Sequence, residues 1–150
     1  MIVKPRIRGF ICTTAHPTGC AAHVQEQINY VAHQGTAADD AFKNVLVLGC
    51  SGGYGLASRV VAGLGYGANT LGVSFEKAPT ENKTASAGWY NNLAYERAAK
   101  EAGLYARTLD GDAFSDALRT SRSGHTSRHG SDRPSDIQPR VARAPASAHR

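Results

Sequence analysis

A glycine-rich stretch near the middle of the chain has the composition of a phosphate-binding turn. It reads Gly49-Cys50-Ser51-Gly52-Gly53-Tyr54-Gly55 and stands between an apolar run of strand length and a helical repeat of apolar residues. Glycines at such a turn permit a tight reversal and let backbone N–H groups approach a pyrophosphate at a helix N-terminus. Because glycine-rich turns also occur where only a sharp turn is needed, the stretch alone leaves both interpretations open.

Glu76 favours the dinucleotide interpretation. It lies 21 positions after Gly55, at the predicted end of the next strand, where an acid can bind both hydroxyls of the adenosine ribose. A carboxylate there repels a 2′-phosphate, so the two features together predict NADH/NAD as the cofactor. Lys77 complicates this preference, because a basic neighbour can tolerate the extra phosphate. An ordinary solvated strand end is the alternative for Glu76.

The same turn also fits the nucleophile elbow of α/β hydrolases, through the pattern Gly49-x-Ser51-x-Gly53. A hydrolase needs an acid and then a histidine downstream in the folded body. Every histidine after Ser51 lies beyond residue 118, so the sequence favours nucleotide binding over hydrolysis.

Four candidate zinc ligands, Cys12, His16, Cys20 and His23, occur close together near the N-terminus. Their spacings, C-x3-H and C-x2-H, do not match the paired arrangements of zinc sites. We therefore expect a turn and a helix start here, and no metal site.

The residues with chemical potential need a scaffold, and the hydropathy pattern predicts an α/β fold. The expected unit is a partial Rossmann-like parallel sheet, β-α-β-α-β. Strands are expected at 44–48, 70–76 and 104–109, with helices between them that end at Gly65 and Gly103. The first strand is apolar along almost its whole length, which predicts burial of both its faces.

Two elements are expected before this unit. Residues 2–12 alternate basic and apolar side chains and predict an extended leader or hairpin, with Gly9 as a candidate bulge. Residues 20–34 predict a helix that docks through one apolar face. That face is formed by Val24, Ile28 and Val31. In the last helix of the unit, Trp89 and Leu93 are expected to pack together in the core.

The composition changes abruptly at Arg119. Residues 1–118 hold ten basic and ten acidic side chains, whereas 119–150 hold seven arginines and two aspartates, which accounts for the net charge of +5. Such a segment buries too little apolar surface to offset its ordering entropy. We expect a truncated NAD(H)-binding domain over 1–118 and a disordered basic tail over 119–150. That tail is either a non-native, frameshift-like continuation or a true tail.

Composition also limits partners and compartment. Because the excess positive charge is confined to the tail, the body offers no basic face for nucleic acid. No apolar run approaches the ~20 residues that span a bilayer, and the first residues lack the apolar core of a signal peptide. The sequence therefore predicts a cytoplasmic protein without nucleic-acid or membrane partners.

Blocks spread over nearly all of 1–118 resemble the single-chain trans-2-enoyl reductases of the FabV type, found in bacteria. The blocks are Ile2-Val3-Lys4-Pro5-Arg6-Ile7-Arg8-Gly9-Phe10-Ile11-Cys12, Ala15-His16-Pro17, Gly19-Cys20, Gly53-Tyr54-Gly55-Leu56-Ala57, Thr70-Leu71-Gly72-Val73, Phe75-Glu76, Ala87-Gly88-Trp89-Tyr90-Asn91 and Gly111-Asp112-Ala113-Phe114-Ser115-Asp116. None lies beyond residue 118.

The resemblance implies NADH-dependent reduction of the carbon–carbon double bond of an enoyl-CoA or enoyl-acyl-carrier-protein in fatty-acid biosynthesis. It also implies roles for individual residues. Gly49, Cys50, Ser51, Gly52, Gly53 and Tyr54 would hold the pyrophosphate region, Phe75 and Glu76 the adenosine, and Asp112 and Ala113 the adenine edge. Gly52 departs from the family pattern, which usually has a hydroxyl residue there. The resemblance therefore implies that this chain lacks one cofactor hydrogen bond and some of the loop rigidity that the hydroxyl residue gives the family.

The family also uses a Tyr-x8-Lys pair as general acid and electrostatic support, and this sequence contains no such pair. The resemblance therefore implies a cofactor-binding part without catalytic residues, inactive alone. The competing hypothesis is a non-catalytic dinucleotide-binding or interaction module with a basic tail.

Overall fold

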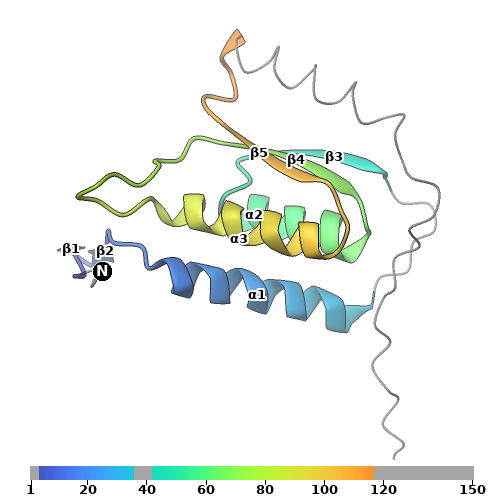
Figure 1. The fold of residues 1–150 in the computed structure, drawn as a ribbon, viewed down its shortest axis with the longest axis horizontal. Helices are drawn as coiled ribbons and strands as arrows, with labels where there is room; N and C mark the ends of the chain where they lie inside the picture. Colours follow the sequence, from blue (N-terminus) through green and yellow to red (C-terminus); the bar gives the residue numbers. More distant parts are fainter. Residues whose placement is uncertain (1–3, 36–41, 117–150) are drawn as a thin grey trace, which may run out of the picture.

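The computed structural model describes residues 4–35 and 42–116, and these form three layers (Figure 1). A sheet lies on one side, α2 and α3 cover one of its faces, and α1 packs beneath those two helices. The elements in chain order are β1 (Ile7–Arg8), β2 (Ile11–Cys12), α1 (Pro17–Gln34), β3 (Asn44–Leu48), α2 (Gly53–Val60), the π-helical turn η1 (Val61–Gly65), β4 (Asn69–Ser74), α3 (Ala87–Glu101) and β5 (Ala106–Asp110).

The three-stranded sheet has the order β3-β4-β5, and both pairs are parallel. Val47 pairs with Gly72, which in turn pairs with Thr108, so the three strands are in register at their centres. Because the strands are parallel, their carboxyl ends meet at one edge of the sheet. This confirms the predicted partial Rossmann-like β-α-β-α-β unit.

The main core lies between the helices rather than above the sheet. Its fully buried members are Val24, Val31, Leu56, Val60, Tyr95 and Ala99, and Ile28 packs against them. The contribution of Val24, Ile28 and Val31 confirms that α1 docks through the predicted apolar face. Burial of these side chains holds α1 against α2 and α3.

The prediction that both faces of the first strand are buried is wrong for the described residues. Val47 is buried toward the helices, but Leu46 and Leu48 on the opposite face are 48% and 51% exposed. The physical reason is that α2 and α3 lie on the same side of the sheet (Figure 1). No other described helix covers the second face of β3.

Several predicted bounds shift. The second strand ends at Ser74 rather than at residue 76, because the last ladder pair joins Ser74 to Asp110. The third strand begins at Ala106, since the N–H of Leu104 is still bonded to the Ala99 carbonyl at 2.9 Å. The helix predicted after Gly55 starts at Gly53.

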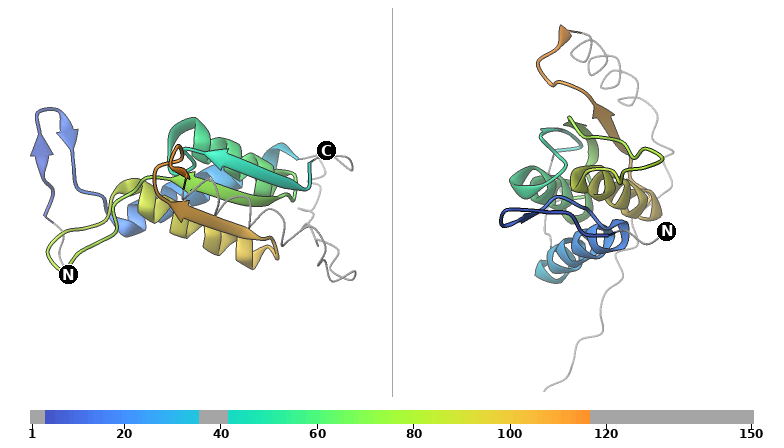
Figure 2. Two further views of the ribbon diagram at one scale, coloured as in Figure 1. Left: turned by 90° about the horizontal axis from the view of Figure 1, so that it is seen from above. Right: turned by 90° about the vertical axis from the view of Figure 1, so that its left-hand side faces the viewer.

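The leader forms the antiparallel hairpin β1-β2, which stands apart from the three layers (Figure 2). Gly9 has a φ of 63° and lies in the hairpin turn, so the predicted bulge is replaced by a turn. The expected Trp89–Leu93 core pair is also wrong, because Leu93 is half exposed and Tyr95 is the buried aromatic of α3.

The predicted disordered basic tail at 119–150 lies outside the described residues. So does the part of the competing interaction-module hypothesis that depends on it. Within the described ranges, no helix combines the length and apolarity needed to cross a membrane.

Candidate functional site

The glycine-rich turn follows β3 and folds back over the end of β4. The N–H groups of Gly49 and Cys50 both donate to the Val73 carbonyl, at 2.8 and 3.2 Å. Gly49 has a φ of 71°, in the left-handed region that favours glycine. A side chain at Gly55 would overlap the Gly49 carbonyl. The turn is therefore closed by backbone contact that only glycine permits.

The start of α2 presents unobstructed backbone. The helix begins at Gly53, and the preceding Gly52 carries no side chain that could cap it. A Cβ built at Gly49, Gly52 or Gly53 would have no atom within 4 Å, so open space borders all three. The first N–H groups of a helix have no partner within it and attract anions. These glycines therefore form a cradle that suits a phosphate.

Glu76 lies directly beside this turn. Its Oε1 accepts a hydrogen bond from Ser51 Oγ at 2.6 Å, and its Oε2 accepts one from Ser86 Oγ. A side chain at Gly88 would overlap both the Glu76 carboxylate and Ser51. The structure thus brings together two features that lie 25 positions apart in the sequence.

The remaining predicted site residues also lie at the carboxyl edge of the sheet. Phe75 follows β4 with its side chain 83% exposed, and Tyr54 projects from the start of α2 at 94% exposure. The N–H of Gly111 donates to the Ser74 carbonyl at 2.8 Å, which anchors the segment after β5 to the end of β4. Asp112 accepts a hydrogen bond from the Phe114 N–H at 2.9 Å, in a turn that places Ala113 beside it. No hydrogen bond within the described residues joins Asp112 to Glu76.

A buried arginine supports the turn from below. Arg59 of α2 is completely buried, and its Nη1 donates to Thr108 Oγ1 at 2.8 Å and contacts Cys50 Sγ at 3.7 Å. Its Nη2 donates to the Arg107 carbonyl at 2.8 Å. The guanidinium therefore links the turn to β5 on the face of the sheet that α2 and α3 cover.

Two asparagines of α3 complete the support. Asn91 Nδ2 donates to the Ser51 carbonyl at 2.9 Å. Asn92 Nδ2 donates to Ser74 Oγ at 2.9 Å, and its Oδ1 faces Arg59 at 3.4 Å. The turn is thus tied to α3 as well as to the strands.

Burial sets the state of the cysteine in the turn. Burial raises the pKa of the Cys50 thiol above its ordinary value, and the nearby Arg59 cation only partly opposes this. Cys50 is therefore a neutral packing group under the turn.

Sequence reasoning missed four of these residues as parts of the site: Arg59, Ser86, Asn91 and Asn92. The sequence did carry a signal for three of them. Arg59 interrupts an apolar helical stripe, and the adjacent Asn91 and Asn92 put amides in a helix that faces a sheet. Polar side chains at buried helical positions normally have specific partners. Ser86 carried no comparable signal, because serine before a helix is usually only a cap.

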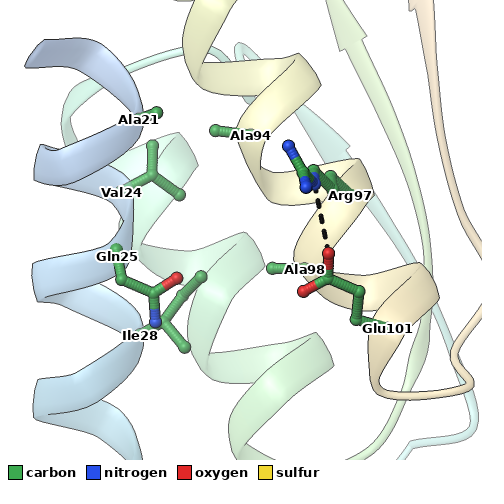
Figure 3. Close-up of a pocket in the computed structure, with 8 residues that line it drawn as sticks. All are labelled: Ala21, Val24, Gln25, Ile28, Ala94, Arg97, Ala98 and Glu101. Atoms are coloured by element: carbon green, nitrogen blue, oxygen red, sulfur yellow. Dashed lines mark hydrogen bonds and ion pairs between the residues drawn. The ribbon is translucent and has the colours of Figure 1, made fainter. Parts of the chain in front are cut away.

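A separate hollow lies between α1 and α3, on the side away from the sheet (Figure 3). Small and aliphatic side chains form most of its wall, together with the exposed Arg97–Glu101 ion pair. It is lined by Ala21, Val24, Gln25, Ile28, Ala94, Arg97, Ala98 and Glu101. None of the predicted site residues lines it, so it does not belong to the candidate site.

The described histidines, at positions 16, 23 and 33, lie at or on α1, whereas Ser51 lies in the turn after β3. In the described part of the chain, no group of three or more His, Cys, Asp or Glu side chains is placed to hold a metal ion.

Comparison with known proteins identifies the family. Residues 2–81 match the NAD(P)H binding domain of trans-2-enoyl-CoA reductase. The chain belongs to this family. Residues 83–128 match the trans-2-enoyl-CoA reductase catalytic region, so the two domains of the trans-2-enoyl-CoA reductase family meet near the loop that follows Glu76.

Curated relatives share most of the described sequence. The enoyl-acyl-carrier-protein reductase (NADH) of Pseudoalteromonas atlantica is 63% identical over 119 residues, which cover 79% of this chain and 30% of the relative. The enoyl-acyl-carrier-protein reductase (NADH) FabV of Aeromonas salmonicida is 60% identical over 119 residues, with the same coverage. The chain therefore spans about 30% of the length of these relatives.

Solved structures of the trans-2-enoyl-CoA reductase family share the fold. The Treponema denticola trans-2-enoyl-CoA reductase, in complex with NAD, matches with a TM-score of 0.81 and 54% identity. The match covers 87% of this chain and 34% of that one. The Clostridium acetobutulicum enzyme, in complex with NADH, matches with a TM-score of 0.79 and 35% identity, covering 86% and 32%.

Proposed function

We propose that this chain binds NADH at the carboxyl edge of its sheet, as the cofactor-binding part of an enoyl-thioester reductase of fatty-acid biosynthesis. The observation that carries the proposal is the Ser51–Glu76 hydrogen bond of 2.6 Å, which places an acid against a glycine-rich turn. Relatives named as NADH-dependent reductases, and a solved relative in complex with NAD, support it. An enoyl-CoA or enoyl-acyl-carrier-protein substrate and a cytoplasmic location belong to the same proposal.

The residues present fit a dinucleotide. The bare backbone of residues 49–54 would hold the pyrophosphate, since open space borders three of its glycines. Glu76 would accept hydrogen bonds from the ribose hydroxyls, beside the exposed ring of Phe75, with Asp112 and Ala113 at the adenine edge. When bound, the nicotinamide would supply a hydride to the double bond of the enoyl thioester.

We further propose that this chain alone does not turn over substrate. Reduction also needs a general acid held at the reacting carbon, and no Tyr in the sequence is followed by Lys at the ninth position. The described candidate site contains residues suited to the adenosine and the pyrophosphate, and none placed as a general acid. Binding without reduction is therefore the expected behaviour.

The test is calorimetric titration of the full 150-residue chain with NADH and with NADPH, together with NADH oxidation in the presence of crotonyl-CoA. We expect tighter binding of NADH than of NADPH and no oxidation. Glu76→Gln should weaken NADH binding by roughly tenfold, as expected for loss of a charge-assisted hydrogen bond. Glu81→Gln, which changes an exposed acid in the same loop, is the matched control and should bind as the unmodified chain does. Absence of NADH binding would contradict the proposal, and turnover would contradict the missing-acid argument.

A further inference from the structure

Ser86 stands at the N-cap position of α3, but its hydroxyl does not cap the helix. A serine there ordinarily accepts a hydrogen bond from a backbone N–H in the first turn. In this chain the hydroxyl donates to Glu76 Oε2 and accepts from the Lys77 N–H at 3.1 Å. The start of α3 therefore lacks a side-chain cap from Ser86, and the Ser86 hydroxyl binds the Glu76 carboxylate instead.

Ser86 itself is held firmly by the loop that follows β4. Its N–H donates to the Lys77 carbonyl at 3.1 Å, and the neighbouring Ala85 N–H donates to Tyr90 Oη at 3.1 Å. These bonds close the segment between Lys77 and Ser86 onto itself and onto α3. The hydroxyl therefore approaches Glu76 from a fixed point.

The two oxygens of Glu76 are each bound by one serine, Ser51 on Oε1 and Ser86 on Oε2. A carboxylate offers about four lone-pair positions, so two hydroxyl donors leave acceptor capacity for the two ribose hydroxyls. The absence of a side chain at Gly88 lets the carboxylate sit against α3. The Glu76 carboxylate is thus held in one orientation and keeps acceptor positions for the ribose hydroxyls.

We propose that Ser86 is a positioning residue for nucleotide selectivity, which fixes the Glu76 carboxylate where it accepts from a 2′-hydroxyl and repels a 2′-phosphate. The inference rests on the proposed function. Without the Ser86 hydroxyl, Ser51 is the one remaining side-chain donor to the carboxylate among the described residues, and the carboxylate can rotate toward solvent. The neighbouring Lys77 then faces a 2′-phosphate with less opposing charge, so discrimination against NADPH falls.

The experiment measures the Kd of the full chain for NADH and for NADPH in Ser86→Ala, Ser86→Thr and Glu76→Gln. Thr80→Ala, which removes an exposed hydroxyl from the same loop, is the control. We expect Ser86→Ala to reduce the ratio of NADPH Kd to NADH Kd by about threefold to tenfold, the range for one hydrogen bond. Ser86→Thr should keep the ratio, because it keeps the hydroxyl. A purely structural role would weaken both nucleotides equally and leave the ratio unchanged.

Hydrogen exchange of the nucleotide-free chain gives a second readout. The Lys77 amide should exchange faster in Ser86→Ala and normally in Ser86→Thr and Thr80→Ala. An unchanged ratio in Ser86→Ala, alongside a changed ratio in Glu76→Gln, would overturn this inference and leave the proposed function intact. No NADH binding by the unmodified chain would overturn both.

Discussion

The guanidinium carbon of Arg59 lies 4.5 Å from the centre of the Tyr95 ring, and both side chains are completely buried. The same guanidinium bonds Thr108 and the Arg107 carbonyl, and Tyr95 Oη donates to the Arg59 carbonyl at 3.1 Å. The cation–π contact thus joins α2 to α3. The glycine-rich turn packs on this cluster, because Cys50 of the turn contacts the Arg59 guanidinium.

Arg59→Met should lower the free energy of unfolding by about 3 kcal/mol, because it leaves part-buried acceptors on β5 without their donor. Arg97→Met is the matched control: Arg97 is exposed, and its ion-pair partner among the described residues is Glu101 in the same helix, so the change should stay within about 0.5 kcal/mol. Urea denaturation measures both. Equal effects of the two substitutions would show that the buried cluster does not support the fold.

Gly55→Ala and Gly52→Ala should differ sharply in their effect on the free energy of unfolding. A Cβ at Gly55 would overlap the Gly49 carbonyl, whereas a Cβ at Gly52 meets open space. We expect Gly55→Ala to cost about 2 kcal/mol or more through overpacking and Gly52→Ala to cost less than about 1 kcal/mol. Thermal unfolding measures this difference. A tolerated alanine at Gly55 would contradict the close approach that shapes the turn.

Stability should decline at alkaline pH through Tyr95. Burial raises the pKa of Tyr95 above its ordinary value of 10.0, although its bond to Thr70 and the Arg59 cation oppose the shift. A group with a raised folded-state pKa gives stability that is fully present below pH 10.0 and is lost as the pH rises through the folded pKa.

Tyr95→Phe should therefore lose about 1 kcal/mol at pH 7 and show a smaller further loss above pH 10 than the unmodified chain. Tyr30→Phe changes an exposed tyrosine of α1 and should leave the profile unchanged. Denaturation at several pH values measures this. The same alkaline slope with and without the Tyr95 hydroxyl would be inconsistent with the assignment.

Cys50 should resist thiol reagents in the folded chain. Its side chain is fully buried, and burial raises the pKa of its thiol above 9.0, so the reactive thiolate is scarce. Peptide mass spectrometry after iodoacetamide treatment should show labelling of Cys50 on the order of a hundredfold slower than in urea. Cys20, only half-buried, should label faster. Rapid native labelling of Cys50 would mean that the turn opens readily.

The sequence predicted the parallel unit because its signals are local: apolar runs of strand length, helical repeats and glycine stops. Glu76 could be paired with the turn because parallel strands place their carboxyl ends together. The exposed face at Leu46 and Leu48 could not be predicted. An apolar strand has the same sequence pattern whether helices cover one face of its sheet or both, so its burial depends on which layers are present. Ser86 and Arg59 were missed because their roles depend on contacts with residues on other elements.

The most direct test of the central claim is to record amide chemical shifts of the full chain during titration with NADH. We predict perturbations at residues 49–54, at Phe75 and Glu76, and at Asp112 and Ala113, all at the carboxyl edge of the sheet. Amides around the hollow between α1 and α3, such as Ala21 and Ala98, should stay unchanged. Perturbations confined to that hollow, or none anywhere, would contradict the assignment of the sheet edge as the NADH site.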